Sequence, residues 1–230
     1  MSARDEILGR VRAALTDVQT APGAGADPVA SAEVAVGATT PPGATRETLE
    51  LFAENVADYR ATVVRVDSVL GEVGVGSAVA GALRDRGCAS AVVPGGLDPA
   101  WREAVAGAVE IRDEADAATP QVLDQVDAVV TASAVGIATT GTIVLHHGAD
   151  QGRRELTLVP DTHVCVIRAD QVVRDVPEAV ARLRTESGQQ PALTWISGPS
   201  ATSDIELQRV EGVHGPRNLI VVIVSTDTVS

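Results

Sequence analysis

Two segments of the chain gather hydroxyl groups, glycines and charged side chains next to apolar runs that are typical of strands. The first covers residues 131–173 and the second residues 194–216. Both contain more polar and glycine residues than a structural connection needs, and loops on a rigid scaffold commonly carry binding and catalytic groups. The candidate ligand-binding or interaction residues in them are Thr140, Gly141, Thr142, Arg153, Asp161, His163, Gly198, Ser200, Thr202, Asp204, Glu206, His214 and Gly215.

The first segment begins with a hydroxyl-rich turn at residues 139–142 and later contains two adjacent arginines. Gly141 allows the backbone to approach a ligand closely or to adopt a positive φ. An ordinary turn that leads into a strand explains the same residues equally well. Because neighbouring residues of an extended chain point to opposite faces, we expect at most one of Arg153 and Arg154 to face a ligand.

Two histidines have neighbours that suggest a role. Asp161 and His163 are two residues apart and share a face of an extended chain, so the carboxylate either orients the imidazole or satisfies a turn. His214 precedes Gly215 in a glycine-rich loop, where core packing is a poor explanation.

In the second segment Gly198 interrupts an apolar run, and a helix start follows. Ser203 and Glu206 fit a capping box, in which each side chain accepts a hydrogen bond from the first turn. Capping is therefore a sufficient explanation for these two residues. It leaves three polar residues unexplained, namely Ser200, Thr202 and Asp204.

Familiar catalytic motifs fit these residues poorly. A hydrolase triad of Ser200, Asp204 and His214 lacks the second glycine of a nucleophile elbow. His146 and His147 would point to opposite faces of a strand, and no metal-binding spacing such as HExxH occurs, so no metal site is expected. The glycines of the GEVGVG run follow a helical pattern rather than a strand, which excludes a dinucleotide-binding fingerprint.

The composition excludes several classes of protein. The chain has 31 acidic and 18 basic residues, and its net charge of -13 repels nucleic acid phosphates. All basic residues are Arg, which excludes Schiff-base chemistry and the lysine of a P-loop. Cys88 and Cys165 are the only thiols, whereas an iron–sulfur cluster usually takes about four. We expect a cytoplasmic protein with no redox cofactor, nucleic acid partner or membrane span.

The chain divides into three parts by pattern. Residues 1–19 predict an amphipathic helical arm, and residues 20–44, rich in Ala, Gly and Pro, predict a flexible linker. Over residues 45–230, apolar runs, including one at 156–160, alternate with helical patterns. This predicts an α/β domain with an open, mostly parallel sheet and helices on both faces. Ligands then bind where the carboxyl ends of the strands open into loops. The arm needs a covering surface, either the domain, a second copy of the chain or a partner.

From about residue 127 to residue 224 the chain resembles the LUD-domain family, through the blocks TTGTIVL, GRRELTLVPDTHVCVIRADQVV and TWISGPSATSDIELQRVEGVHGPRNLIVVIV. The resemblance implies a fold like that of the ribose-5-phosphate isomerase and CoA-transferase superfamily. It also implies a role in oxidising L-lactate to pyruvate, beside two partner proteins that carry iron–sulfur clusters. The family commonly has Glu-Thr-Gly-Thr in the first loop, where Thr139 replaces the Glu here. Any role of that carboxylate is lost or moved in this chain.

Three functions stay open. The chain is a non-redox subunit of a lactate-oxidising system, a regulatory module that binds a small carboxylate, or an enzyme of the CoA-transferase or isomerase kind. In the first, Arg153 or Arg154 would bind a carboxylate through two hydrogen bonds. In the third, Glu206 or Asp204 would act as base or nucleophile. The resemblance favours the first function.

Overall fold

The computed structural model describes residues 4, 6, 8, 10, 44–184, 192–202, 210–211 and 215–225, with backbone alone at 201–202 and 210–211. The chain forms two compact units, Met1–Thr39 and Thr40–Ser230. In the first unit the four described residues are helical. The arm and the linker therefore stay predictions, since nearly all of their residues lie outside the described part.

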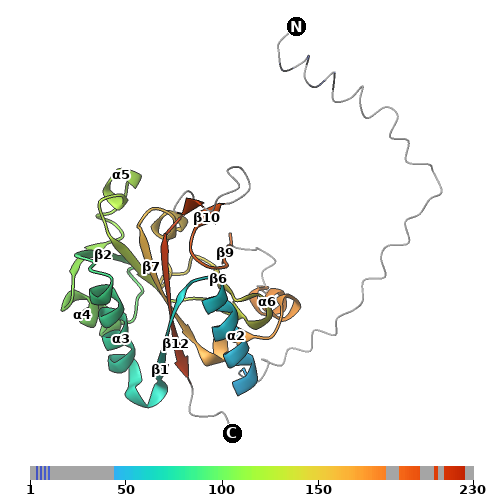
Figure 1. Cartoon of the computed structure of the whole chain (residues 1–230). Coiled ribbons are helices and arrows are strands. Elements are labelled where there is room, and N and C mark those ends of the chain that lie inside the picture. Colours follow the sequence, from blue (N-terminus) through green and yellow to red (C-terminus); the bar gives the residue numbers. More distant parts are fainter. Residues whose placement is uncertain are drawn as a thin grey trace. The chain divides into compact units, whose positions relative to one another are not determined.

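A six-stranded parallel sheet forms the centre of the second unit (Figure 1), in the order β1-β12-β7-β4-β2-β3. The predicted α/β class with a mostly parallel sheet is confirmed. The inner strands are nearly continuous apolar runs because both of their faces are covered. The strands are β1 (Thr62–Asp67), β2 (Ser90–Val93), β3 (Glu110–Asp113), β4 (Ala128–Thr131), β7 (Thr162–Arg168) and β12 (Asn218–Ser225).

Alternate residues of the central strands enter different cores. Val164 and Val166 of β7 pack in one cluster with residues of α3 (Gly71–Asp85) and α4 (Pro99–Ala106). Cys165 and Ile167 belong to another cluster, which contains the buried residues of α2 (Arg46–Asp58). The two-residue period of the strand thus places α3 and α4 on one face of the sheet and α2 on the other.

A second sheet shares the face of α2, in the order β8-β5-β6-β9. Ile143 and Leu145 of β6 pack with Cys165 and Ile167, while Val144 turns away towards the helix α6. The expected helices on both faces are therefore found only in part, because a sheet covers much of one face. The strands of this second sheet are β5 (Val135–Ile137), β6 (Thr142–Leu145), β8 (Val172–Val173) and β9 (Thr194–Ile196). The helix α6 (Val176–Leu183) covers it.

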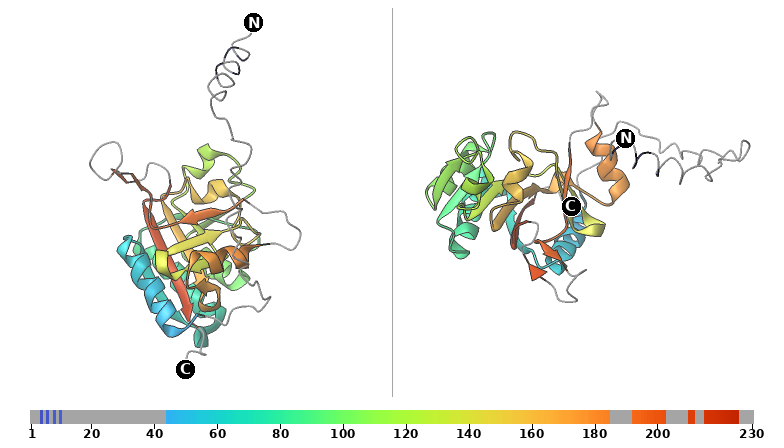
Figure 2. Two further views of the ribbon diagram at one scale, coloured as in Figure 1. Left: turned by 90° about the vertical axis from the view of Figure 1, so that its right-hand side faces the viewer. Right: turned by 90° about the horizontal axis from the view of Figure 1, so that it is seen from above.

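The other helices are short. Seen from above (Figure 2, right), α4 in green and α6 in orange lie on opposite sides of the α/β unit. The helix α5 (Pro120–Leu123) covers β2 and β4 through Leu123, which packs on Val92 and Val129. No described helix is long and apolar enough to cross a membrane. The remaining elements are the 3-10 helices η1 (Ser68–Leu70), η2 (Ala138–Thr140), η3 (Arg154–Thr157) and η4 (Ala169–Gln171) and the hairpin of β10 (Ala201–Thr202) and β11 (Val210–Glu211).

One expected strand is wrong. The apolar run at residues 156–160 lies in η3 and the turn after it, with Leu156 buried beside Val92 and Leu123. A short apolar run fits a buried strand and a buried helical turn equally well, so its pattern alone does not separate them.

Candidate functional site

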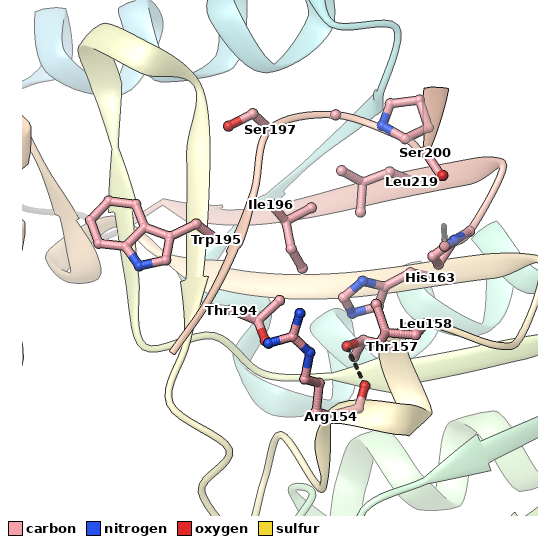
Figure 3. A pocket seen from close by; sticks show the side chains of 14 residues that line it. Arg154, Thr157, Leu158, His163, Thr194, Trp195, Ile196, Ser197, Ser200 and Leu219 are labelled. Carbon is pink, nitrogen blue, oxygen red and sulfur yellow. Dashed lines mark hydrogen bonds between the residues drawn. The ribbon is translucent and has the colours of Figure 1, made fainter. Parts of the chain in front are cut away.

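A cavity of about 340 Å³ lies between the two sheets (Figure 3). His163 and Leu219, each the second residue of its strand, form its floor, and residues 194–200, 215–216 and η3 form its walls. The cavity therefore lies at the amino ends of β7 and β12. The sequence predicted a ligand at the opposite edge, where the carboxyl ends of the strands meet.

The two candidate segments meet at this cavity. Thr140 Oγ1 donates a hydrogen bond to Thr142 Oγ1 over 2.8 Å, and Thr142 Oγ1 lies 2.8 Å from Ser197 Oγ on the cavity wall. Further along, the backbone N–H of Ser200 donates to the carbonyl of Pro216 over 2.8 Å. The predicted residues that line the cavity are His163, Gly198, Ser200 and Gly215.

Two of the candidate glycines are explained by packing against α2. Gly141 has a φ of 55°, and a Cβ there would lie 2.7 Å from the carbonyl carbon of Asn55. The amide of Asn55 also donates to the carbonyl of Ala138 over 2.8 Å. Gly198 has a φ of 84°, and its Cβ would lie 2.7 Å from that of Tyr59. Both glycines let a candidate segment approach α2 closely.

The adjacent arginines take different positions. The Arg153 guanidinium donates to the carbonyls of Glu114 and Ala117, and its Nη1 lies 3.4 Å from Glu114 Oε1. Arg153 does not line the inter-sheet cavity. Arg154 is exposed and lines it, and none of the described residues forms an ion pair or hydrogen bond with its guanidinium. The arginine available to a ligand in this cavity is Arg154.

The two residues of the predicted Asp161–His163 pair separate. Asp161 is exposed and forms an ion pair with Arg217, with 3.2 Å between Oδ1 and Nε. His163 is 1% exposed, and its Nε2 lies 2.8 Å from Thr131 Oγ1. Burial lowers the pKa of His163 to about 4, because the interior disfavours the charged ring. The cavity floor is therefore uncharged at neutral pH.

A second histidine, which the sequence suggested only as a weak metal ligand, approaches the cavity through Thr194. His147 has a φ of 58°, a left-handed conformation that is uncommon outside glycine. Its Nδ1 lies 3.1 Å from the carbonyl oxygen of Gly152, and its Nε2 lies 2.8 Å from Thr194 Oγ1. Thr194 lines the cavity and Gly148 follows the histidine in the turn. In the sequence, the one signal for this turn is Gly148, which follows the end of a predicted strand.

The wall of the cavity favours a small anion with a short apolar part. Arg154 is its charged group, and none of the described lining residues is Asp or Glu. Hydroxyl groups of Thr157, Thr194 and Ser197 and apolar side chains such as Leu219 complete the lining. Three candidates lie outside the described residues, namely Asp204, Glu206 and His214. Thr202 is described only as backbone in β10.

A second cavity, of about 330 Å³, occupies the carboxyl edge of the main sheet. It is lined by Asp98, Asp150 and Arg168 among others. The Arg168 guanidinium is already engaged, since it lies 2.6 Å from a carboxylate oxygen of Glu72 and 5.7 Å from the ring centre of Trp101. With its cation paired and two acidic groups present, this cavity suits a small anion less well than the inter-sheet cavity does.

Comparisons with known proteins agree with this architecture. A Deinococcus radiodurans protein named Lactate utilization protein C is 42% identical over 178 residues, which are 77% of this chain and 80% of that protein. The protein of the same name from Bacillus subtilis is 31% identical over 105 residues, so the match covers only 43% of that relative. A crystal structure of a duf162 family protein from Deinococcus radiodurans has a TM-score of 0.63 and 35% identity. It covers 80% of this chain and 99% of the other.

The predicted family is confirmed by a domain model. The LUD domain model matches residues 44–224, which contain both sheets, the helices α2–α6 and the inter-sheet cavity. The kinship with the ribose-5-phosphate isomerase and CoA-transferase superfamily stays a prediction. On the domain match and the Deinococcus relative together, the chain belongs to the LUD domain family.

Proposed function

We propose that this chain is the non-redox component of a lactate-utilization system that oxidises L-lactate to pyruvate. In this proposal, partner proteins carry the iron–sulfur clusters, and the chain works with them in the cytoplasm. The observation that carries the proposal is the 42% identity with Lactate utilization protein C across 80% of that protein. Because the match takes in 77% of this chain, the proposal applies to a whole folded unit rather than to a short motif.

The environment of the two thiols supports the part of this proposal that places the iron–sulfur clusters on partner proteins. Cys165 lies inside β7, fully buried, and burial raises the pKa of its thiol to about 12. Cys88 is half-buried after α3, and burial raises the pKa of that thiol as well. A protonated thiol is a poor metal ligand, since the thiolate is the binding form. Electrons from lactate would therefore pass through a partner protein.

The inter-sheet cavity supports binding of a small carboxylate to this component. A guanidinium binds a carboxylate through two parallel N–H···O bonds, and Arg154 has no such partner among the described residues. Leu158, Ile196 and Leu219 line the same cavity and would cover a methyl group. Burial of one such group contributes about 0.8 kcal/mol. Lactate and pyruvate both have a carboxylate and a methyl group.

Gene deletion in the source organism tests the lactate role. We expect the deletion strain to lose growth on L-lactate as sole carbon source, and the wild-type gene to restore it. Arg154→Ala should restore growth poorly, whereas Arg84→Ala, which removes an exposed arginine of α3, should restore it fully. Unimpaired growth of a strain that has no second copy of the gene would reject the lactate role.

A carboxylate-sensing module is the second candidate, because the Arg154 cavity would serve a sensor equally well. A ligand at 100 times its dissociation constant adds about 2.7 kcal/mol to stability, so binding is visible as a rise in Tm. Stabilisation by lactate together with normal growth of the deletion strain would favour the sensor. Stabilisation together with lost growth favours the component of a lactate-oxidising system.

A further inference from the structure

We propose that Thr194, held in place by His147, recognises the 2-hydroxyl group of the bound acid, so that the inter-sheet cavity selects 2-hydroxy carboxylates over 2-oxo carboxylates. The proposal rests on the carboxylate-binding function above and makes it specific. It separates lactate from pyruvate, which share the carboxylate and the methyl group and differ only at the second carbon.

The hydrogen bonds of His147 fix which ring nitrogen carries the proton. A backbone carbonyl only accepts hydrogen bonds, so Nδ1, 3.1 Å from the carbonyl oxygen of Gly152, must carry a hydrogen. In the neutral ring Nε2 then has a lone pair and accepts. Thr194 Oγ1, 2.8 Å from Nε2, is therefore the donor of that bond.

This arrangement turns the Thr194 oxygen into an acceptor towards the cavity. A hydroxyl group has one hydrogen and two lone pairs, and the hydrogen of Thr194 is already given to His147. The remaining lone pairs can accept a hydrogen bond from a ligand hydroxyl. A keto oxygen at the same place has only lone pairs. It could not donate a hydrogen bond to the Thr194 oxygen, so two acceptor atoms would face each other.

The position of Thr194 suits the second carbon of an acid bound by Arg154. Thr194 begins β9, opposite Leu145 of β6, and is 9% exposed. Thr194 and Arg154 both line the inter-sheet cavity (Figure 3). In the proposed pose the carboxylate lies on Arg154, the hydroxyl of the second carbon faces Thr194, and the methyl group contacts Leu219 and the other apolar residues.

The backbone of His147 adds an independent reason to assign a role to this pair. Its φ of 58° is a left-handed conformation, which is unfavourable for a residue with a side chain. A simple turn has no need of a histidine there, and Gly148 is the next residue. Strained residues that persist are commonly held for a functional geometry. Here the strain places the ring between Gly152 and Thr194.

Isothermal titration of the purified full-length chain with L-lactate and with pyruvate tests the selectivity. We expect the wild type to bind lactate about tenfold more tightly, the difference that one net hydrogen bond makes. Thr194→Val, which keeps the shape and removes the hydroxyl, should bind the two acids equally. Thr194→Ser should keep the preference, and His147→Phe should weaken it because the Thr194 hydroxyl is then free to donate.

The controls separate this inference from the proposed function. Ser77→Ala removes an exposed hydroxyl of α3, outside the cavity, and should leave the preference intact. If wild type and Thr194→Val bind both acids equally, and Arg154→Ala loses both, the carboxylate site stands and the hydroxyl recognition is overturned. If the wild type binds neither acid, both ideas are overturned. Circular dichroism of each variant checks folding. If Thr194→Val does not fold, His147→Phe decides the question, because a full lactate preference in that variant would overturn the hydroxyl recognition.

Discussion

Replacement of Gly141 by alanine probes the contact between the first candidate segment and α2. The φ of 55° places the residue in the left-handed region, where a side chain costs about 1–2 kcal/mol. The new Cβ would also lie 2.7 Å from the carbonyl carbon of Asn55 and 2.9 Å from the backbone nitrogen of Val56, in the last turn of α2, and helix backbone cannot move aside as a side chain can. Overpacking of this kind costs about 1–3 kcal/mol. We expect Gly141→Ala to lower the free energy of unfolding by about 2–5 kcal/mol.

Two other glycines separate the two contributions. Gly87 has a φ of 70°, but a Cβ there meets no atom within 4 Å, so Gly87→Ala carries the backbone cost alone, about 1–2 kcal/mol. Gly81 lies inside α3, has no positive φ and also faces open space. Gly81→Ala should stabilise the chain by about 0.5–1 kcal/mol, because alanine loses less backbone entropy in a helix.

Urea unfolding followed by circular dichroism measures all three variants against the wild type. The expected order of stability is Gly81→Ala, wild type, Gly87→Ala and Gly141→Ala. A loss for Gly141→Ala no larger than that for Gly87→Ala would show that α2 does not press on this turn. The same result would undermine the placement of Ser197, since its partner Thr142 directly follows Gly141.

Three further predictions concern a buried histidine, a partly exposed ion pair and the two thiols. The pKa of His163 is about 4 against an ordinary 6.5. Between pH 6.5 and pH 4 the unfolded chain takes up a proton on this histidine and the folded chain does not. The free energy of unfolding should therefore fall by about 3 kcal/mol as the pH drops through this range. In urea titrations, His163→Gln should remove this contribution to the pH dependence of the free energy of unfolding. The ion pair of Glu72 and Arg168 is 2.6 Å long and partly exposed, so removal of either side chain should lower the free energy of unfolding by about 1 kcal/mol. In a double-mutant cycle the two losses should not add. Additive losses would show that the two side chains are uncoupled. In iodoacetamide labelling read by mass spectrometry, Cys165 should stay unmodified in the folded chain and Cys88 should react slowly; rapid labelling of Cys165 would contradict its burial.

The main sheet could be predicted from the sequence because most of its strands, such as β7 and β12, are apolar runs between helical patterns. The second sheet could not. Its strands contain two to four residues, and β6 pairs with β9 through contacts such as Leu145 with Thr194, far apart in the chain. Periodicity indicates where a strand lies but not which distant strand it pairs with. The sequence therefore could not show that one face of the main sheet is covered by α2 together with a second sheet.

The candidate site shows the same division. The sequence drew attention to the two polar segments but did not predict that they meet, and in the structure Thr142 Oγ1 lies 2.8 Å from Ser197 Oγ. The choice between Arg153 and Arg154 could not be made, because the alternation of an extended strand does not apply where η3 begins. Thr194 and His147 were not chosen, since their importance comes from a single contact between distant segments.

The second sheet explains why this fold has a polar cavity at the amino ends of its strands. After β4 the chain leaves the main sheet and forms β5 and β6 of the second sheet. The later strand β9 pairs with β6, and this places residues 194–200 next to the amino ends of β7 and β12. Cross-segment hydrogen bonds from Ser197 and Thr194 fix the polar groups of that wall. Changes in β6 and β9 should therefore alter ligand binding while the main sheet stays intact. In a chain of net charge -13, the Arg154 guanidinium has no carboxylate partner among the described residues, and a bound anion would supply that charge.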